Sequence, residues 1–226
     1  MDLNDSGLLS RGQIRIFEQQ GYLAVKGLIT GEQVKELRRD YEKALTGDIH
    51  VPTWGDNHAS GQMVQLANPS QHIPHWRLHA YFQTALAAAR KLMGENTDLA
   101  YDQLIYKPPH YPAETQWHQD AGYWKKSRGS DNAVTCWLAL SPVWKENGGM
   151  QFIPGSHLGD IQDHYSVSHR SEVNSGLETQ VDASHSVAVS LDPGAATFHH
   201  CRTLHFTGGN FTNTARYGLV THFWSQ

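Results

Sequence analysis

Positive charge is scarce in this chain, and charged residues of either sign are fewer than usual. Lys and Arg number 18 against 22 Asp and Glu, the formal net charge is −4, and the four types make up 18% of the 226 residues. The usual share in soluble proteins is roughly 25%. No lysine- or arginine-rich run occurs. Such a chain has no basic field to attract nucleic acid or an anionic membrane, so we expect neither as a partner.

Cysteines and long apolar segments are also few. Only Cys136 and Cys201 are present, without CxxC spacing, and we expect two reduced thiols rather than a single disulfide. The first residues lack the basic region and apolar region of a secretory signal. The most apolar helical stretch, FQTALAAARKLMG, is interrupted by Arg90 and Lys91 and is too short to span a bilayer. We therefore expect a soluble, cytoplasmic protein.

The residues that are abundant indicate a compact, loop-rich domain. Hydrophobic residues make up 39% of the chain, and 20 glycines, 15 histidines and 7 tryptophans replace the missing charges. We expect helices at 10–21, 30–47 and 75–93, with a polar loop at 48–70. The first two segments begin with Ser or Thr followed three residues later by Gln, and they end at Gly. These are signals that start and stop a helix.

Beyond residue 97 the hydrophobic pattern changes to period two, which predicts strands. Runs of this kind, separated by glycine and proline, occupy 99–107, 133–142, 150–157, 185–191, 195–200 and 216–224. Helices followed by many short strands predict a β-sandwich or barrel with helices packed on one side. We expect one domain over 1–226, in which 1–97 is mostly helical support and 98–226 is a mainly β core.

One long segment fits neither pattern. Residues 158–186 are polar and have no sustained periodicity. Long irregular loops inside compact domains are commonly lids or disordered segments, and we favour a lid here.

The stretch TQWHQDAGYW places His118 and Asp120 two residues apart between tryptophans. On a strand the two side chains would project from the same face. An imidazole and a carboxylate in apolar surroundings need a partner, and a metal ion suits both. Two histidines and one carboxylate on one face of a metal leave three open positions, as in non-haem Fe(II) oxygenases. The candidate third ligands are His199, His200, His205 and His222.

Three spaced motifs resemble a known family. They are WHQDAGYW, VTCWLALSPVWKENGGMQFIPGSH and ATFHHCRTLHFTGGNFTNTARYGL, and they are similar to those of the phytanoyl-CoA dioxygenase family. The resemblance extends from about residue 103 to the C-terminus. It implies a double-stranded β-helix, a jelly-roll and cupin-like fold with flanking α-helices. It also implies Fe(II), 2-oxoglutarate and O₂ as cofactor and co-substrates.

The resemblance selects particular residues for the site. The family pattern has an Arg eleven residues after its distal His, which here gives His205 as third ligand and Arg216 as the Arg. A planar guanidinium grips a carboxylate through two parallel hydrogen bonds, as the far carboxylate of 2-oxoglutarate requires. The family's hydroxyl beside that carboxylate falls on Thr207, where Ser is commoner. Trp137 and Gln103 match two further co-substrate positions, although Trp137 also suits a core and Gln103 a substrate contact.

The family reaction implies a small-molecule substrate, oxidised, most simply by hydroxylation, while 2-oxoglutarate is converted to succinate and CO₂. Desaturation, epimerisation and ring formation share its first step. Halogenation is not expected, because related halogenases have a small residue where this chain has Asp120. Tyr123 and Trp124 are candidate substrate contacts, with an ordinary core role as the alternative. His169 and Arg170 would meet an anionic substrate unless they lie in a solvated loop.

Two other functions also fit a metal-binding jelly roll. One is a domain that binds a ligand without oxidising it, which would have no need of Arg216. The other is a cupin-type isomerase that uses a different divalent ion. Anaerobic addition of Fe(II) and 2-oxoglutarate distinguishes them, because only the oxygenase forms a coloured complex with both.

Overall fold

The computed structural model describes residues 9–54, 62–124, 132–167 and 176–225. Its strands are β1 (Tyr22–Val25), β2 (Val64–Ala67), β3 (Thr97–Lys107), β4 (Thr115–His118), β5 (Ala133–Ala139), β6 (Met150–Phe152), β7 (Tyr165–Ser166), β8 (Leu177–Glu178), β9 (Val187–Ala188), β10 (Ala196–His200), β11 (His205–Thr207) and β12 (Arg216–Ser225). Its α-helices are α1 (Arg11–Gln20), α2 (Gly31–Thr46), α3 (Pro69–His72), α4 (Ala80–Met93) and α5 (Asp120–Tyr123). Short 3₁₀ turns η1 (Pro74–Leu78), η2 (Lys145–Asn147), η3 (Ser156–Leu158) and η4 (Ala183–His185) join them.

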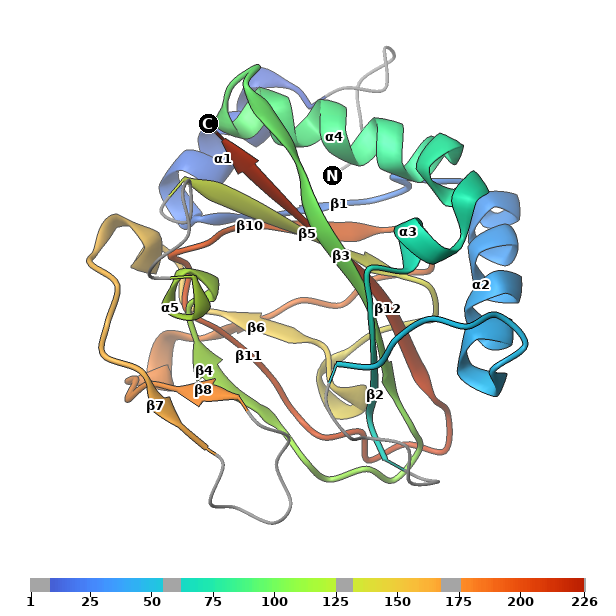
Figure 1. The fold of residues 1–226 in the computed structure, drawn as a ribbon. Coiled ribbons are helices and arrows are strands. Elements are labelled where there is room, and N and C mark those ends of the chain that lie inside the picture. Colours follow the sequence, from blue (N-terminus) through green and yellow to red (C-terminus); the bar gives the residue numbers. More distant parts are fainter. Residues whose placement is uncertain (1–8, 55–61, 125–131, 168–175, 226) are drawn as a thin grey trace.

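Two antiparallel sheets form the core of the molecule. The larger has the strand order β1-β10-β5-β12-β3-β2 and the smaller has the order β4-β11-β6-β9. Figure 1 shows the smaller sheet below the larger one, with α1 and α4 along the outer side of the larger sheet. This is the jelly-roll arrangement of the double-stranded β-helix. The predicted fold class is therefore confirmed.

The larger sheet is buried on both faces, because helices cover one face and the smaller sheet covers the other. Every residue of β5 is buried. Phe198 and Leu219 pack among helix residues such as Tyr81, whereas Trp137 and Val220 pack toward Phe152 of the smaller sheet. Alternate residues of a strand thus serve two separate clusters, as the period of a strand requires.

Both predicted capping boxes are present. Ser10 and Thr30 accept hydrogen bonds from the backbone N–H groups of Gln13 and Gln33. The Gln side chains accept from the backbone N–H of Ser10 and Thr30 in return.

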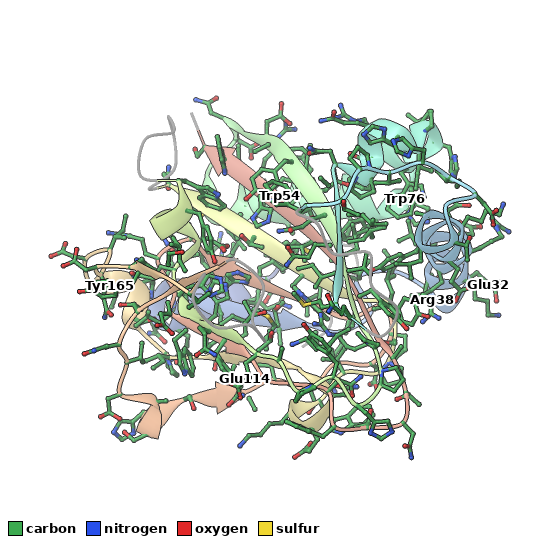
Figure 2. The ribbon with its side chains drawn as sticks, turned by 60° about the horizontal axis from the view of Figure 1, so that its bottom comes forward. Glu32, Arg38, Trp54, Trp76, Glu114 and Tyr165 are labelled. Atoms are coloured by element: carbon green, nitrogen blue, oxygen red, sulfur yellow. The ribbon has the colours of Figure 1, made fainter. Side chains whose placement is uncertain are left out.

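α2 lies against the edge of the barrel, and Figure 2 shows its Arg38 on the side of the molecule away from Tyr165. The Arg38 guanidinium carbon lies 3.4 Å from the centre of the Tyr217 ring.

Several predicted boundaries were wrong. The helix expected at 75–93 is divided, because His79 has an extended backbone and caps α4 through its own side chain. The loop expected at 48–70 contains β2, which pairs with β3. The strand expected at 150–157 ends at Phe152, where the chain turns into η3. Segment 158–186 contains β7, β8 and η4 in its described part.

Cys136 and Cys201 are both buried, and neither is joined in a disulfide within the described residues. Within the described ranges, none of the helices has the length and apolar character needed to cross a bilayer.

Candidate metal centre

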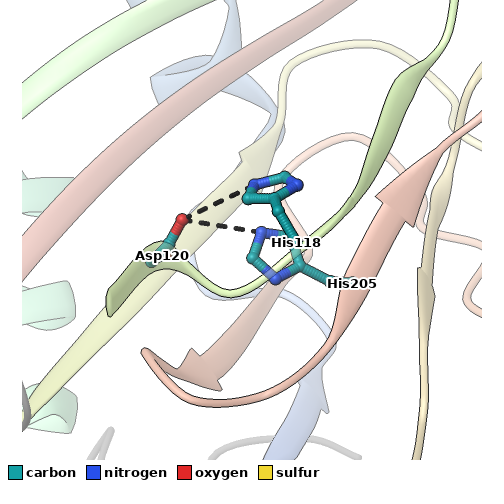
Figure 3. A group of neighbouring side chains, drawn as sticks. All are labelled: His118, Asp120 and His205. Atoms are coloured by element: carbon teal, nitrogen blue, oxygen red, sulfur yellow. Dashed lines mark ion pairs between the residues drawn. The ribbon is translucent and has the colours of Figure 1, made fainter. Parts of the chain in front are cut away.

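The fold brings His118, Asp120 and His205 together (Figure 3). His118 ends β4 and His205 begins β11, and the two residues are directly opposite each other because these strands pair. One ligand atom from each of the three side chains lies within 4.8 Å of the others, and all three residues are buried. The prediction that His118 and Asp120 share a strand was wrong. The strand ends at His118, and Asp120 is the first residue of α5.

The two imidazoles are oriented by backbone carbonyls. Nδ1 of His118 donates to the Gln116 carbonyl at 2.7 Å, and Nδ1 of His205 donates to the Thr203 carbonyl at 2.9 Å. Each ring therefore directs an unprotonated Nε2 at Oδ1 of Asp120, at 3.8 Å and 3.6 Å. Three lone-pair donors facing one point have no proton to share, which is a favourable arrangement for a cation. Such backbone contacts are typical of metal-binding histidines.

Burial keeps the two histidines neutral. It lowers the pKa of His118, and it lowers the pKa of His205 well below its usual value. Burial by itself would raise the pKa of Asp120, but at acid pH the neighbouring histidines, His205 foremost, attract the carboxylate when they are protonated and hold its pKa well below the usual range. The group thus carries one negative charge and two neutral nitrogens near neutral pH, and these protonation states are the ones a divalent metal binds.

A buried guanidinium faces the same cavity as these three residues. Arg216 is 1% exposed, and its Nε and Nη1 atoms have no hydrogen-bond partner among the described residues. Its guanidinium carbon lies 5.1 Å from the centre of the Trp137 ring. Burial lowers the pKa of Arg216 to about 10, so the side chain stays charged at neutral pH. An unpaired buried cation is costly, and a bound carboxylate would relieve that cost.

Lys107 lies beside Arg216 and places a buried amino group next to the guanidinium. The two residues are register partners on β3 and β12. Lys107 Nζ donates to the Gly208 carbonyl at 2.6 Å and lies 3.4 Å from Oγ1 of Thr207. Burial lowers the pKa of Lys107 well below its usual value. Thr207 and Arg216 line the cavity, and Lys107 lies behind them, fully buried.

The cavity that contains these groups has a volume of about 430 Å³. Aromatic side chains line much of it: Trp54, Tyr101, Tyr123, Trp124, Trp137 and Trp224. Val167 and Leu177 also line it, and the backbone N–H of Leu177 donates to the hydroxyl of Tyr123 at 2.8 Å. A cavity of this size holds a small organic molecule beside a co-substrate.

The structure sorts the predicted site residues into groups. The predicted metal and 2-oxoglutarate residues all line this one cavity, as do Tyr123 and Trp124. Trp124 is 8% exposed, and its indole N–H donates to the Tyr101 hydroxyl at 2.9 Å. His169 and Arg170 lie outside the described residues.

Of the other three candidate ligands, His199 and His222 line the cavity near Asp120, whereas His200 does not. Sequence reasoning missed Thr135, whose hydroxyl donates to Oδ2 of Asp120 at 2.5 Å. It also missed Lys107. Neither residue had a signal in the sequence. Lys107 is the last residue of β3, where a lysine is ordinarily exposed, and a threonine in a strand is ordinary.

Comparison with known proteins assigns the chain to a family. The model of the phytanoyl-CoA dioxygenase (PhyH) family matches residues 17–218. The chain belongs to the phytanoyl-CoA dioxygenase family. It is 26% identical over 225 residues to a probable alpha-ketoglutarate-dependent hypophosphite dioxygenase of Stutzerimonas stutzeri, covering 92% of this chain and 76% of that protein. It is 24% identical to the peroxisomal phytanoyl-CoA dioxygenase of Mus musculus, covering 98% of this chain and 70% of that protein.

A solved structure supports the same assignment. The crystal structure of EvdO2 from Micromonospora carbonacea var. aurantiaca, complexed with 2-oxoglutarate, aligns with a TM-score of 0.81 at 25% identity. The alignment covers 96% of this chain and 91% of EvdO2. The fold and the family predicted from the three sequence motifs are therefore confirmed.

Replacing Gly218 with alanine is expected to disturb this family member's guanidinium site. A Cβ at Gly218 would overlap the indole ring of Trp137, over which Arg216 lies. Overpacking of this kind costs about 1–3 kcal/mol, so urea unfolding of Gly218→Ala should show a loss of that size. Gly31→Ala is the control, because an added Cβ there meets nothing within 4 Å. Equal stability of the two variants would show that Trp137 moves without cost.

Acid is expected to destabilise the metal-free protein through its buried histidines. Burial lowers the pKa of both His200 and His222 from 6.5 to about 4. Between these values the unfolded chain binds more protons than the native one, so the free energy of unfolding falls as the pH drops from about 6.5 to about 4. Each such group contributes up to about 3 kcal/mol over that range.

The variant His200→Asn tests this expectation. The slope of unfolding free energy against pH between 4 and 6.5 should be smaller in His200→Asn than in the parent protein. His185→Asn, at an exposed position, should leave the slope unchanged. An unchanged slope in His200→Asn would mean that His200 binds its proton in the native state as readily as in the unfolded chain.

Proposed function

We propose that this protein oxidises a small organic molecule, most simply by hydroxylation, with His118, Asp120 and His205 as its iron ligands. As a member of the phytanoyl-CoA dioxygenase family, it is a non-haem Fe(II)- and 2-oxoglutarate-dependent dioxygenase. The observation that carries the proposal is the pair of unpartnered guanidinium nitrogens of Arg216 in the same cavity as the three candidate ligands.

The three side chains fit the proposed metal. Two imidazole nitrogens and one carboxylate oxygen are the ligand set of non-haem Fe(II) oxygenases, and three coordination positions stay open for co-substrate and O₂. Iron, when bound, supplies the redox chemistry that couples the decarboxylation of 2-oxoglutarate to substrate oxidation. The protein contributes the orientation of His118 and His205 through the Gln116 and Thr203 carbonyls.

Arg216 is proposed to bind the far carboxylate of 2-oxoglutarate. Its Nε and Nη1 atoms are buried donors without partners among the described residues, and a carboxylate can accept charge-assisted hydrogen bonds from such a guanidinium. The hydroxyl of Thr207 lines the same end of the cavity. A ligand-binding domain without oxidation chemistry would gain nothing from this uncompensated cation, so the arrangement favours the oxygenase.

The substrate is proposed to occupy the aromatic part of the cavity. Tyr101, Tyr123 and Trp124 lie on the same cavity as the metal ligands, and they offer flat apolar surface with a few polar atoms. The described lid residues Val167 and Leu177 close the wall beside Tyr123, so we assign segment 158–186 to substrate selection. Cys136 and Cys201, which form no disulfide within the described residues, support a reducing compartment such as the cytoplasm.

Anaerobic titration with Fe(II) and 2-oxoglutarate, followed by a substrate screen, tests the proposal. The complex should show a visible charge-transfer band that needs both components. Aerobic addition of candidate metabolites should then raise succinate release above the uncoupled background. A protein that binds Fe(II) yet develops no band with 2-oxoglutarate would support a binding domain or an isomerase instead.

A further inference from the structure

The second oxygen of Asp120 belongs to a chain of hydrogen bonds that leads away from the proposed metal. Oδ1 faces the two imidazoles, whereas Oδ2 accepts the hydroxyl proton of Thr135 at 2.5 Å and also lies 3.3 Å from Nε2 of His199. The same hydroxyl lies 2.9 Å from Nδ1 of His222. At the far side of that ring, Nε2 lies 3.0 Å from the amide nitrogen of Gln103. The chain thus joins Asp120 to a residue of the cavity wall.

The chemistry of the atoms assigns a direction to each link. A carboxylate only accepts, so the single proton of Thr135 points to Asp120. Thr135 then accepts from His222, which places the ring proton on Nδ1 and leaves a lone pair on Nε2. The amide nitrogen of Gln103 donates to that lone pair. The three hydrogen bonds therefore run in one direction, from Gln103 through His222 and Thr135 to Asp120.

The surroundings hold this chain in place. Thr135 is 1% exposed and His222 is 3% exposed. The Tyr101 ring is stacked on His222 with ring centres 4.2 Å apart, and the Trp124 indole N–H donates to the Tyr101 hydroxyl. Gln103 lines the cavity, and among the described residues its amide oxygen has no partner.

We propose that Thr135, supported by His222 and Gln103, is a positioning residue that restricts Asp120 to one metal-binding oxygen. The part of this proposal that concerns metal binding by Asp120 rests on the proposed function. An Asp120 bound through both oxygens would occupy one of the three coordination positions that 2-oxoglutarate and O₂ need. By accepting the proton of Thr135, Oδ2 would stay turned away from a bound metal, which would prevent this. The same chain directs the amide oxygen of Gln103 into the cavity, so a substrate reaching that wall meets a hydrogen-bond acceptor.

Isosteric replacement of Thr135 tests whether this residue affects metal binding by Asp120. Thr135→Val keeps the shape of the side chain and removes the hydroxyl, whereas Thr135→Ser keeps the hydroxyl. Loss of an outer contact to a metal ligand typically weakens metal binding about 10- to 100-fold. Co(II) titrations monitored by visible absorption should show that loss in Thr135→Val and recovery in Thr135→Ser. The band intensities should also change in Thr135→Val, because the coordination number changes.

Thr197→Val is the matched control. Thr197 is fully buried in the neighbouring strand β10, and its hydroxyl has no partner among the described residues. The same isosteric change there should leave Co(II) affinity and spectrum as they are in the parent protein. Identical affinities and spectra in Thr135→Val and the parent protein would overturn the positioning role.

The tautomer of His222 tests the hydrogen-bond chain without any metal. Long-range ¹H–¹⁵N spectra of the metal-free protein distinguish a proton on Nδ1 from one on Nε2, and the signal is assigned by its loss in His222→Gln. The hydrogen-bond chain predicts that His222 is protonated on Nδ1 in the parent protein. In Thr135→Val, His222 should no longer be held in this one tautomer. A proton on Nε2 of His222 in the parent protein would contradict the proposed hydrogen-bond chain. Absence of a 2-oxoglutarate complex with a correct tautomer would instead contradict the proposed function.

Discussion

Replacing Asp120 with alanine is expected to eliminate the coloured Fe(II)–2-oxoglutarate complex and substrate-dependent succinate release. Asp120 supplies the only carboxylate among the three grouped ligands, and two neutral imidazoles alone hold a divalent cation weakly. The loss should exceed the roughly 10- to 100-fold effect of removing an outer contact to a ligand. Anaerobic absorption titration measures the complex, and a succinate assay measures turnover.

Asp98→Ala is the control for that experiment. The Asp98 side chain is 69% exposed and is not one of the residues that line the cavity. Its removal should leave both readings unchanged. If Asp120→Ala retains the band at parental Fe(II) concentrations, the metal binds elsewhere and the three grouped residues are not its ligands.

Replacing Arg216 with methionine is expected to have opposite effects on co-substrate binding and on the stability of the co-substrate-free protein. Truncating one partner of a buried charged hydrogen bond costs about 2–5 kcal/mol, so 2-oxoglutarate affinity should fall about 30-fold to several thousand-fold. Without 2-oxoglutarate, however, the guanidinium is buried and its Nε and Nη1 atoms lack partners. Removing such a charge should raise the melting temperature.

Calorimetry with and without 2-oxoglutarate separates the two effects. The melting temperature of the parent protein should rise on addition of 2-oxoglutarate, because only the native state binds it. That rise should vanish in Arg216→Met, which should start from a higher value. Arg77→Met, at an exposed position on η1, should behave like the parent protein. An undiminished rise in Arg216→Met would place the co-substrate away from the guanidinium.

Sequence motifs located the principal residues of the candidate site because their spacing is particular to one family. His205 was chosen from four histidines by the Arg216 that follows eleven residues later, and the structure places both on the cavity with His118 and Asp120. Periodicity and capping signals also predicted the large-sheet strands β3, β5, β10 and β12 and the helices α1 and α2. These signals are local and therefore readable along one chain.

What sequence reasoning could not predict depends on contacts between distant segments. β2 reads as a polar loop because only its pairing with β3 makes it a strand. Thr135 is one buried threonine among several until β4, α5 and β5 bring its hydroxyl to Asp120. Lys107 likewise gains its place from register pairing with Arg216 across β3 and β12. Long-range pairing of this kind leaves no periodic signal at either residue.

A crystal structure of the anaerobic complex with Fe(II) and 2-oxoglutarate tests the central claim most directly. The expected result is iron within about 2.0–2.2 Å of Nε2 of His118, Nε2 of His205 and one oxygen of Asp120, with the far carboxylate of 2-oxoglutarate on the Arg216 guanidinium. Iron bound away from these three side chains, or a co-substrate that leaves Arg216 unpaired, would contradict it.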